Sequence, residues 1–334
     1  MADLPWPRGS ATGIGSLPGT DDAEAQRLVF GELPDLPHLA ELPDRGPGAD
    51  LIGRSAAFLV DLPVQLYAGR WQIAPRPGKD LRRTSDLLER DLDQLTEQGD
   101  GFRGTIKVQA AGPWTLAAGI DLPIGGRMLR DAGAIRDLTE SLAEGLHRHV
   151  ADVRKRLPGA TVLLQLDEPS LPTVIAGRVP TESGLSAYRA VDASDAASAL
   201  RTVVTAADAP VVVHSCAPDV PLAVIRDAGA TAVSLDLDQL DGSDLDPLGE
   251  LLEIGLGLFA GAVPTRPPAD GRAPASKQVA DRVRTLWNRL SFPMARLPQQ
   301  VVVTPACGLA GAPAGYARAA LKACREVGRR LAEV

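Results

Sequence analysis

One histidine, one aspartate and two cysteines of this 334-residue chain lie at or just beyond the ends of short apolar runs. His214 and Cys216 are two residues apart, Asp236 ends the next run, and Cys307 follows the last one. Side chains at positions i and i+2 of a β-strand point the same way, so His214 and Cys216 can reach one ion. One imidazole, two thiolates and one carboxylate form a tetrahedral set that suits Zn²⁺. Alternatively, the cysteines are small buried apolar residues and His214 is a hydrogen-bonded core histidine.

The apolar runs alternate with amphipathic stretches, and this alternation predicts βαβ units with a parallel sheet. Several runs are continuously apolar, as in strands that are buried on both faces. We expect strands at residues 11–17, 105–110, 161–166, 210–213, 230–235, 254–262 and 300–303, and an eighth between 50 and 73. We expect helices at residues 84–98, 131–157, 194–207, 277–290 and 315–331.

The expected fold is one α/β domain, a single (β/α)8 TIM-type barrel over residues 1–334, with no separate N-terminal barrel. An open doubly wound sheet is less favoured, because none of the expected strands is followed by the glycine-rich fingerprint of a dinucleotide fold. In a barrel, the carboxyl ends of the strands meet at one mouth. The four metal-binding candidates would therefore lie close together. The proline-rich stretches 33–48 and 263–275 are long for connections and are typical of binding loops.

Composition and charge exclude several classes of protein. The chain is 45% hydrophobic and 23% charged, which is ordinary for a globular protein. Its net charge of −7 argues against a nucleic-acid partner. The longest apolar run is too short to span a membrane, and the N-terminus lacks the pattern of a signal peptide. Three widely spaced cysteines make no disulfide framework. We expect a cytoplasmic protein without a membrane partner.

Two other histidines and the third cysteine are expected to be structural. His147 and His149 are two residues apart in an expected helix, on different faces, so we expect exposed histidines rather than a metal pair. Cys324 lies in the last expected helix, where we expect a buried packing residue.

Five motifs together resemble the catalytic C-terminal domain of cobalamin-independent methionine synthase. They occur in the order of that family and span nearly the whole chain: IGSLP (14–18), QLDEPSL (165–171), HSC (214–216), SLD (234–236) and PACGL (305–309). The resemblance implies a (β/α)8 barrel and a zinc-dependent S-methyltransferase that methylates homocysteine to methionine.

The resemblance also implies roles for particular residues. The implied zinc ligands are His214, Cys216, Asp236 and Cys307, with aspartate in place of the glutamate that is usual in the family. The implied contacts to the amino-acid substrate are Ile14, Gly15, Ser16, Glu41 and Asp167. A thiol bound at such a site would lose its proton at neutral pH and stay nucleophilic.

The methyl-donor side departs from the family pattern. The family's proton-donating histidine maps near Ala262, and a glutamate that contacts folate maps to Thr173. These changes put 5-methyltetrahydropteroyltriglutamate or methyltetrahydrofolate in doubt as the donor. A methylcorrinoid protein is the alternative donor, and His38 is a candidate substitute for the missing acid.

Two other functions remain open from the sequence. A decarboxylase that resembles uroporphyrinogen decarboxylase would share the barrel, but that class needs neither the His-x-Cys pair nor the late cysteine. A non-catalytic zinc- or thiol-binding homologue would fit the missing acid, but the substrate-side residues oppose it.

Overall fold

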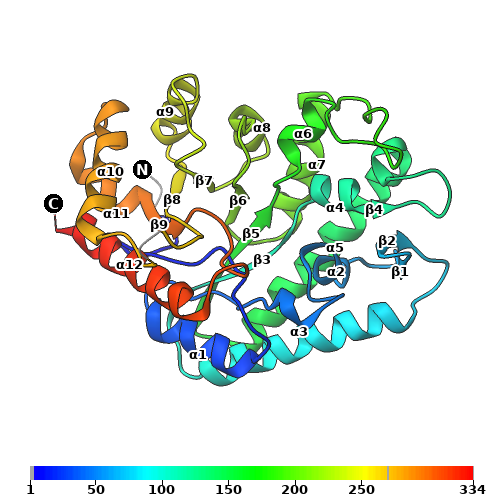
Figure 1. The fold of residues 1–334 in the computed structure, drawn as a ribbon, viewed down its shortest axis with the longest axis horizontal. Helices are drawn as coiled ribbons and strands as arrows, with labels where there is room; N and C mark the ends of the chain where they lie inside the picture. Colours follow the sequence, from blue (N-terminus) through cyan, green and yellow to red (C-terminus); the bar gives the residue numbers. More distant parts are fainter. Residues whose placement is uncertain (1–3, 269–270, 334) are drawn as a thin grey trace.

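A curled sheet of six parallel strands forms the centre of the protein (Figure 1). The computed structural model describes residues 4–268 and 271–333. The strands follow one another in chain order: β3 (Gly104–Ala111), β5 (Ala160–Asp167), β6 (Val211–Ser215), β7 (Ala232–Asp236), β8 (Gly257–Val263) and β9 (Val301–Pro305). Nearly all of their residues are buried, which explains why several of their sequences are apolar with little alternation. The six strands confirm six of the expected eight.

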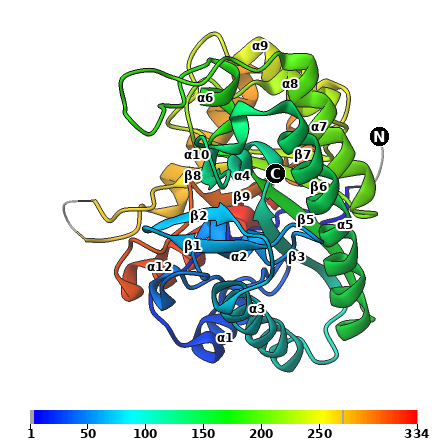
Figure 2. The ribbon, with the colours of Figure 1, turned by 90° about the vertical axis from the view of Figure 1, so that its right-hand side faces the viewer.

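Helices follow the strands and cover the outside of the sheet (Figures 1 and 2). The longer ones are α1 (Asp22–Glu32), α3 (Lys79–Gln98), α5 (Ala132–Arg156), α7 (Ala193–Ala206), α9 (Leu245–Glu253), α10 (Ser276–Arg289) and α12 (Ala314–Ala332). The shorter ones are α2 (Leu51–Ala56), α4 (Pro113–Gly119), α6 (Leu171–Ile175), α8 (Leu222–Asp227), α11 (Leu297–Gln300), η1 (Pro43–Arg45), η2 (Met128–Arg130) and η3 (Met294–Arg296). None of the helices described here combines the length and apolarity needed to cross a membrane.

Two irregular segments connect the edges of the sheet. Residues 10–17 lie against β9, where the N–H of Thr12 donates to the carbonyl of Val303 at 3.1 Å. Residues 37–41 lie against β3, where the N–H of Leu39 donates to the carbonyl of Lys107 at 2.9 Å. The two segments also pair with each other. The three bridges are all parallel and join Ala11 to Val303, Ser16 to Glu41, and His38 to Lys107.

The prediction of a barrel strand between residues 50 and 73 is wrong. That region instead contains α2 and a hairpin of β1 (Val64–Tyr67) and β2 (Arg70–Ile73) (Figure 2). The hairpin joins β4 (Ile120–Asp121) in a separate sheet. Ala68 and Gly69 both have positive φ, at 48° and 79°, as a tight hairpin turn requires. The hairpin makes β1 and β2 antiparallel, so they do not extend the parallel sheet.

The interior of the curled sheet changes from apolar to polar along its strands. Leu163, Val212, Ala232 and Phe259 belong to one apolar cluster, in which Trp6 packs edge-to-face on Phe259. Side chains alternate along a strand, so the residue two positions further on faces the same interior. Those residues are Gln165, His214, Ser234 and Gly261. The polar layer lies next to the carboxyl ends of the strands, where a site is expected.

Candidate functional site

Three of the four expected metal ligands form one cluster. The ligand atoms of His214, Cys216 and Cys307 all lie within 4.8 Å of one another, and the two sulfur atoms are 2.8 Å apart. His214 and Cys216 come from the end of β6, whereas Cys307 follows β9. Strands β7 and β8 separate β6 from β9 in the sheet, so only its curvature brings the two cysteines together.

The imidazole of His214 is oriented for an additional ligand. Its Nδ1 lies 2.9 Å from Oγ of Ser234, which pairs with His214 across β6 and β7. Nε2 is buried and has no hydrogen-bond partner among the residues that the structure describes. A histidine that ligates a metal through one nitrogen usually bonds a neighbouring group through the other. The unpartnered nitrogen and the two thiols therefore fit a metal ion that prefers nitrogen and sulfur, such as Zn²⁺.

The hydrogen bond between the two thiols moves their pKa values in opposite directions. A hydrogen bond from Cys216, assisted by His214 and by the N–H of Gly308, lowers the pKa of Cys307. The same hydrogen bond, together with burial, raises the pKa of Cys216. The pair thus holds one negative charge readily and resists a second one unless a cation is bound.

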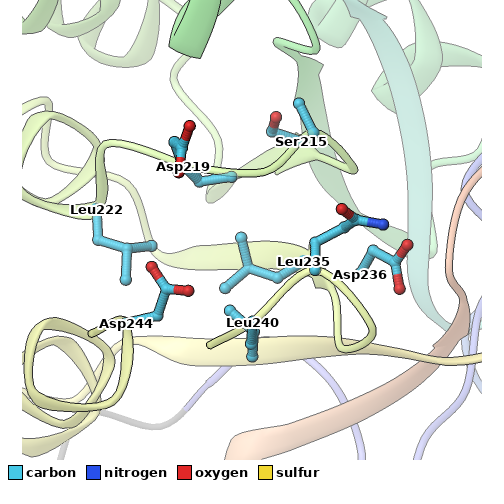
Figure 3. A pocket seen from close by; sticks show the side chains of 10 residues that line it. Ser215, Asp219, Leu222, Leu235, Asp236, Leu240 and Asp244 are labelled. Carbon is cyan, nitrogen blue, oxygen red and sulfur yellow. The ribbon is translucent and has the colours of Figure 1, made fainter. Parts of the chain in front are cut away.

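Asp236, the fourth expected ligand, lies outside this cluster. It ends β7, and its Oδ1 accepts a hydrogen bond of 2.9 Å from the N–H of Asp238. Its carboxylate points away from those of Asp219 and Asp244 around a small adjacent pocket (Figure 3). The described ligand atoms therefore leave one position of a tetrahedral site open.

A cavity of about 230 Å³ adjoins the three ligands. Its lining includes four of the five residues that the resemblance assigns to the substrate, namely Ile14, Ser16, Glu41 and Asp167. Gly15 is buried between Ile14 and Ser16. The cavity is smaller than the pockets that hold drug-sized ligands, and its size suits a molecule such as an amino acid.

Asp167 presents a buried carboxylate to the cavity. It is the last residue of β5 and is only 7% exposed. Gln165 donates a hydrogen bond of 2.7 Å to Oδ1. Burial raises the pKa of Asp167 to about 7, whereas His214 acts in the opposite direction. A bound cation would restore the charged form of this carboxyl group.

Glu41 reaches the cavity through the pairing of its segment with Ser16. Its Oε1 lies 3.2 Å from Nε of Arg54, which in turn forms an ion pair with Asp91. Burial raises the pKa of Glu41, and the charge of Arg54 opposes this shift. The Arg54 side chain holds Glu41 in place and neutralises its charge.

The expected donor-side positions contain no acid that faces the cavity. Ala262 is buried within β8, and Thr173 donates a hydrogen bond of 2.8 Å to the carbonyl of Ser170 in its own turn. His38 is fully buried, and the cavity lining does not include it. Burial, and then the charge of Lys107, lower the pKa of His38 well below its usual value.

Sequence analysis missed three residues that support the site. Ser234 orients His214, whereas Lys107 and Gln165 both donate hydrogen bonds to the carbonyl of Ile14. A signal for Lys107 and Gln165 was present, since each is a long polar residue within an otherwise apolar strand. Ser234 had the weaker signal of belonging to the SLD motif.

Known proteins resemble this chain over nearly its whole length. A sequence model for the family described as "Cobalamin-independent synthase, Catalytic domain" matches residues 10–330. No curated protein sequence matches the chain. A B12-independent methionine synthase from Shewanella sp. W3-18-1, solved in complex with selenomethionine, has a TM-score of 0.59 at 11% identity, with 98% of each chain covered.

Two glycosidases are more distant. A GH5-4 endoglucanase from Clostridium acetobutylicum has a TM-score of 0.42 at 9% identity and covers 93% of this chain and 90% of its own. A family 1 β-glucosidase from Thermotoga maritima has the same TM-score at 11% identity, with 99% of each chain covered. Similarity at this level identifies no function. The match over residues 10–330 confirms the resemblance seen in the motifs, and the chain belongs to the cobalamin-independent synthase catalytic domain family.

Proposed function

We propose that the protein is a zinc-dependent S-methyltransferase that converts homocysteine to methionine. The main observation behind this proposal is that the cluster of His214, Cys216 and Cys307 lines a small cavity, whose walls also contain Asp167 and Glu41. Family membership favours this function over a decarboxylase of related fold. A Zn²⁺ ion held by these three residues would favour the thiolate form of an incoming thiol.

The remaining cavity residues fit the other groups of an amino acid. Asp167 would accept a charge-assisted hydrogen bond from the substrate ammonium, because Gln165 engages Oδ1 and leaves Oδ2 for the ligand. The segment 14–16 would hold the substrate carboxylate through its backbone N–H groups and Ser16. Glu41 lies beside Ser16 and would contact the same end of the substrate. This arrangement would leave the thiol at the open metal position.

Asp236 remains our candidate for a fourth, exchangeable ligand. It ends β7, the strand next to β6, and its side chain is about half-buried. As a fourth ligand it would add to the cluster of His214, Cys216 and Cys307. We also infer that residues 10–17 and 37–41 act as two irregular strands that complete a single eight-stranded barrel within residues 1–334. Their parallel bridges to β9 and β3 support this inference.

We infer the methyl donor from the two donor-side positions, Ala262 and Thr173, which provide no acid. In this proposal the two carboxyl groups of the cavity, Asp167 and Glu41, are engaged with the amino acid. An amine leaving group, as in methyltetrahydrofolate or its triglutamate form, needs a proton, and general acid catalysis contributes ~10²–10⁴-fold. His38 does not reach the cavity, and Ala262 has no titratable group. We therefore expect faster transfer from methylcobalamin or a methylcorrinoid protein, whose leaving group needs no proton.

The test is methionine formation from homocysteine by the zinc-loaded protein, with methyltetrahydrofolate, its triglutamate and methylcobalamin supplied separately. Homoserine, which has a hydroxyl in place of the thiol, is the matched control acceptor and should yield no product. We expect methionine with methylcobalamin and a slower rate with either folate. If no donor yields methionine, the proposed function is wrong. Rapid turnover with a folate donor would refute only the proposal that the methyl group comes from a corrinoid.

A further inference from the structure

We infer that Lys107 is a positioning residue for the substrate carboxylate. Together with Gln165 it fixes the peptide between Ile14 and Gly15 from inside the barrel, so that the N–H of Gly15 is presented to the carboxylate. This inference rests on the proposed function, because it assumes that an amino acid occupies the cavity. It adds a residue that does not itself line the cavity.

The contacts converge on a single carbonyl. Nζ of Lys107 donates to the carbonyl oxygen of Ile14 at 2.8 Å, and Nε2 of Gln165 donates to the same atom at 2.9 Å. Lys107 also donates to Oε1 of Gln109 at 3.1 Å. The side chains of Lys107 and Gln165 are fully buried, so water does not compete for these bonds.

The geometry of the peptide carries the effect to the cavity. A trans peptide is planar, and its C=O and N–H point in opposite directions. The described chain contains no cis peptide bonds. With its carbonyl held by Lys107 and Gln165, the peptide directs the N–H of Gly15 away from the barrel interior. The residues on either side of Gly15, Ile14 and Ser16, both line the cavity.

Stability does not account for a lysine at this position. Lysine is almost never fully buried unless it is paired, and a buried charge is often replaced by an apolar residue without loss of stability. No carboxylate lies within ion-pair distance of Nζ among the described residues. Burial also lowers the pKa of Lys107 to about 8, although Asp167 and Glu41 oppose the shift. A carbonyl that must be held by a strong donor explains the lysine.

The experiment compares two thiols in the metal-loaded protein. Homocysteine carries the α-carboxylate, and 3-aminopropane-1-thiol is the same molecule without it. Their dissociation constants are measured by calorimetry for the unaltered protein and for Lys107→Met. The matched control is Gln300→Met. Gln300 is also buried and donates to two backbone carbonyls, those of Leu252 and Leu256, but it precedes β9 and so lies at the end of that strand opposite to the cavity.

We expect Lys107→Met to weaken homocysteine binding roughly tenfold or more, the scale of one hydrogen bond to a charged group. Binding of 3-aminopropane-1-thiol should change less than about twofold on that scale, and metal content and the control variant should be unaffected. An equal loss for both thiols, or no loss, would overturn the inference. If Lys107→Met does not fold, Lys107→Gln, which keeps a shorter and neutral donor at the same position, should show a smaller loss that is still preferential for homocysteine, and an equal loss for both thiols would again overturn the inference.

The proposed function fails in a different way. If the unaltered protein binds neither thiol, the proposed substrate is wrong and this inference falls with it. If the unaltered protein binds both thiols equally, the cavity does not recognise the carboxylate, and the role of Lys107 is overturned while thiol binding stands.

Discussion

Replacement of Ser234 by alanine should weaken metal binding, although Ser234 is not a ligand. Its Oγ lies 2.9 Å from Nδ1 of His214 and is the side-chain partner that the structure gives to that nitrogen. This bond leaves Nε2 as the nitrogen without a partner among the described residues, in a side chain that belongs to the cluster with Cys216 and Cys307. Without it, the neutral imidazole is free to carry its proton on either nitrogen and to rotate.

The size of the effect follows from the burial of the pair. Both His214 and Ser234 are buried, so alanine leaves Nδ1 without a partner in a site closed to water. An unsatisfied buried polar group costs about 1–3 kcal/mol, and loss of an outer-shell partner typically lowers metal affinity by ~10–100-fold. These two ranges agree, since every 1.4 kcal/mol corresponds to about a factor of ten.

The neighbouring residue Ser215 provides the matched control. Its Oγ is also buried, but it has no hydrogen-bond partner among the described residues, and it lies between His214 and Cys216 in the chain. Zinc affinity is measured by competition with a chromophoric chelator. We expect Ser234→Ala to lose about 10–100-fold and Ser215→Ala to lose little. Equal losses in the two variants would refute the argument that Ser234 orients His214.

Three other outcomes are expected. Asp236→Asn should keep about one zinc per chain by elemental analysis, because its carboxylate lies outside the cluster; loss of the metal would show that Asp236 is an essential ligand. Asp167→Asn should weaken homocysteine binding in calorimetry by roughly 1.5–3 kcal/mol, the range for a hydrogen bond to a charged group, and unchanged affinity would contradict its role. His149 is buried against Phe58, and burial lowers its pKa to about 3. Its neutral form therefore stabilises the fold above pH 6.5, and this contribution falls by about 1.4 kcal/mol per unit as the pH drops toward 3. Between pH 6.5 and pH 4.5, the free energy of unfolding measured with a chemical denaturant should fall less for His149→Leu than for the unaltered protein. Equal decreases would contradict the lowered pKa of His149.

The sequence predicted those strands well that are buried on both faces of the parallel sheet. Several of the runs that became these strands, β6 and β8 above all, are apolar with little alternation, and each run was placed to within a few residues of its strand. The run at 11–17 forms only isolated bridges, because its irregular backbone pairs at single residues. The 50–73 region misled the prediction, since a hairpin that packs in a second sheet shows a similar mixture of apolar and polar residues.

Helix ends and single side chains were less predictable. The helix expected from residue 84 begins at Lys79, because Gly78 provides an extended N-cap five residues before the expected start of the helix. His149, expected to be exposed, is buried, whereas His147 on the other face of α5 is exposed as expected. A spacing of two residues separates helix faces but does not say which face meets the core.

Spacing alone does not distinguish the two adjacent carboxylates of the QLDEPSL motif, although the family resemblance points to Asp167. Asp167 and Glu168 are adjacent, and neighbouring residues of a strand point to opposite sides. Asp167 faces the cavity, whereas Glu168 accepts hydrogen bonds from the N–H groups of Trp114 and Thr115 at the start of α4. Only the register of β5 against its neighbours decides between them. The role of Ser234 depends in the same way on its pairing with His214.

The zinc content of three matched proteins tests the central claim most directly. The proteins are the unaltered chain, Cys307→Ala and Cys324→Ala. Each variant lacks one thiol, but Cys324 is fully buried in α12 and is not part of the metal-binding cluster, so Cys324→Ala is the control. We expect about one zinc per chain in the unaltered protein and in Cys324→Ala, and little in Cys307→Ala, because only His214 and Cys216 of the cluster would remain and the exchangeable Asp236 is too weak to replace a thiolate. Full zinc retention by Cys307→Ala would contradict the proposed metal centre.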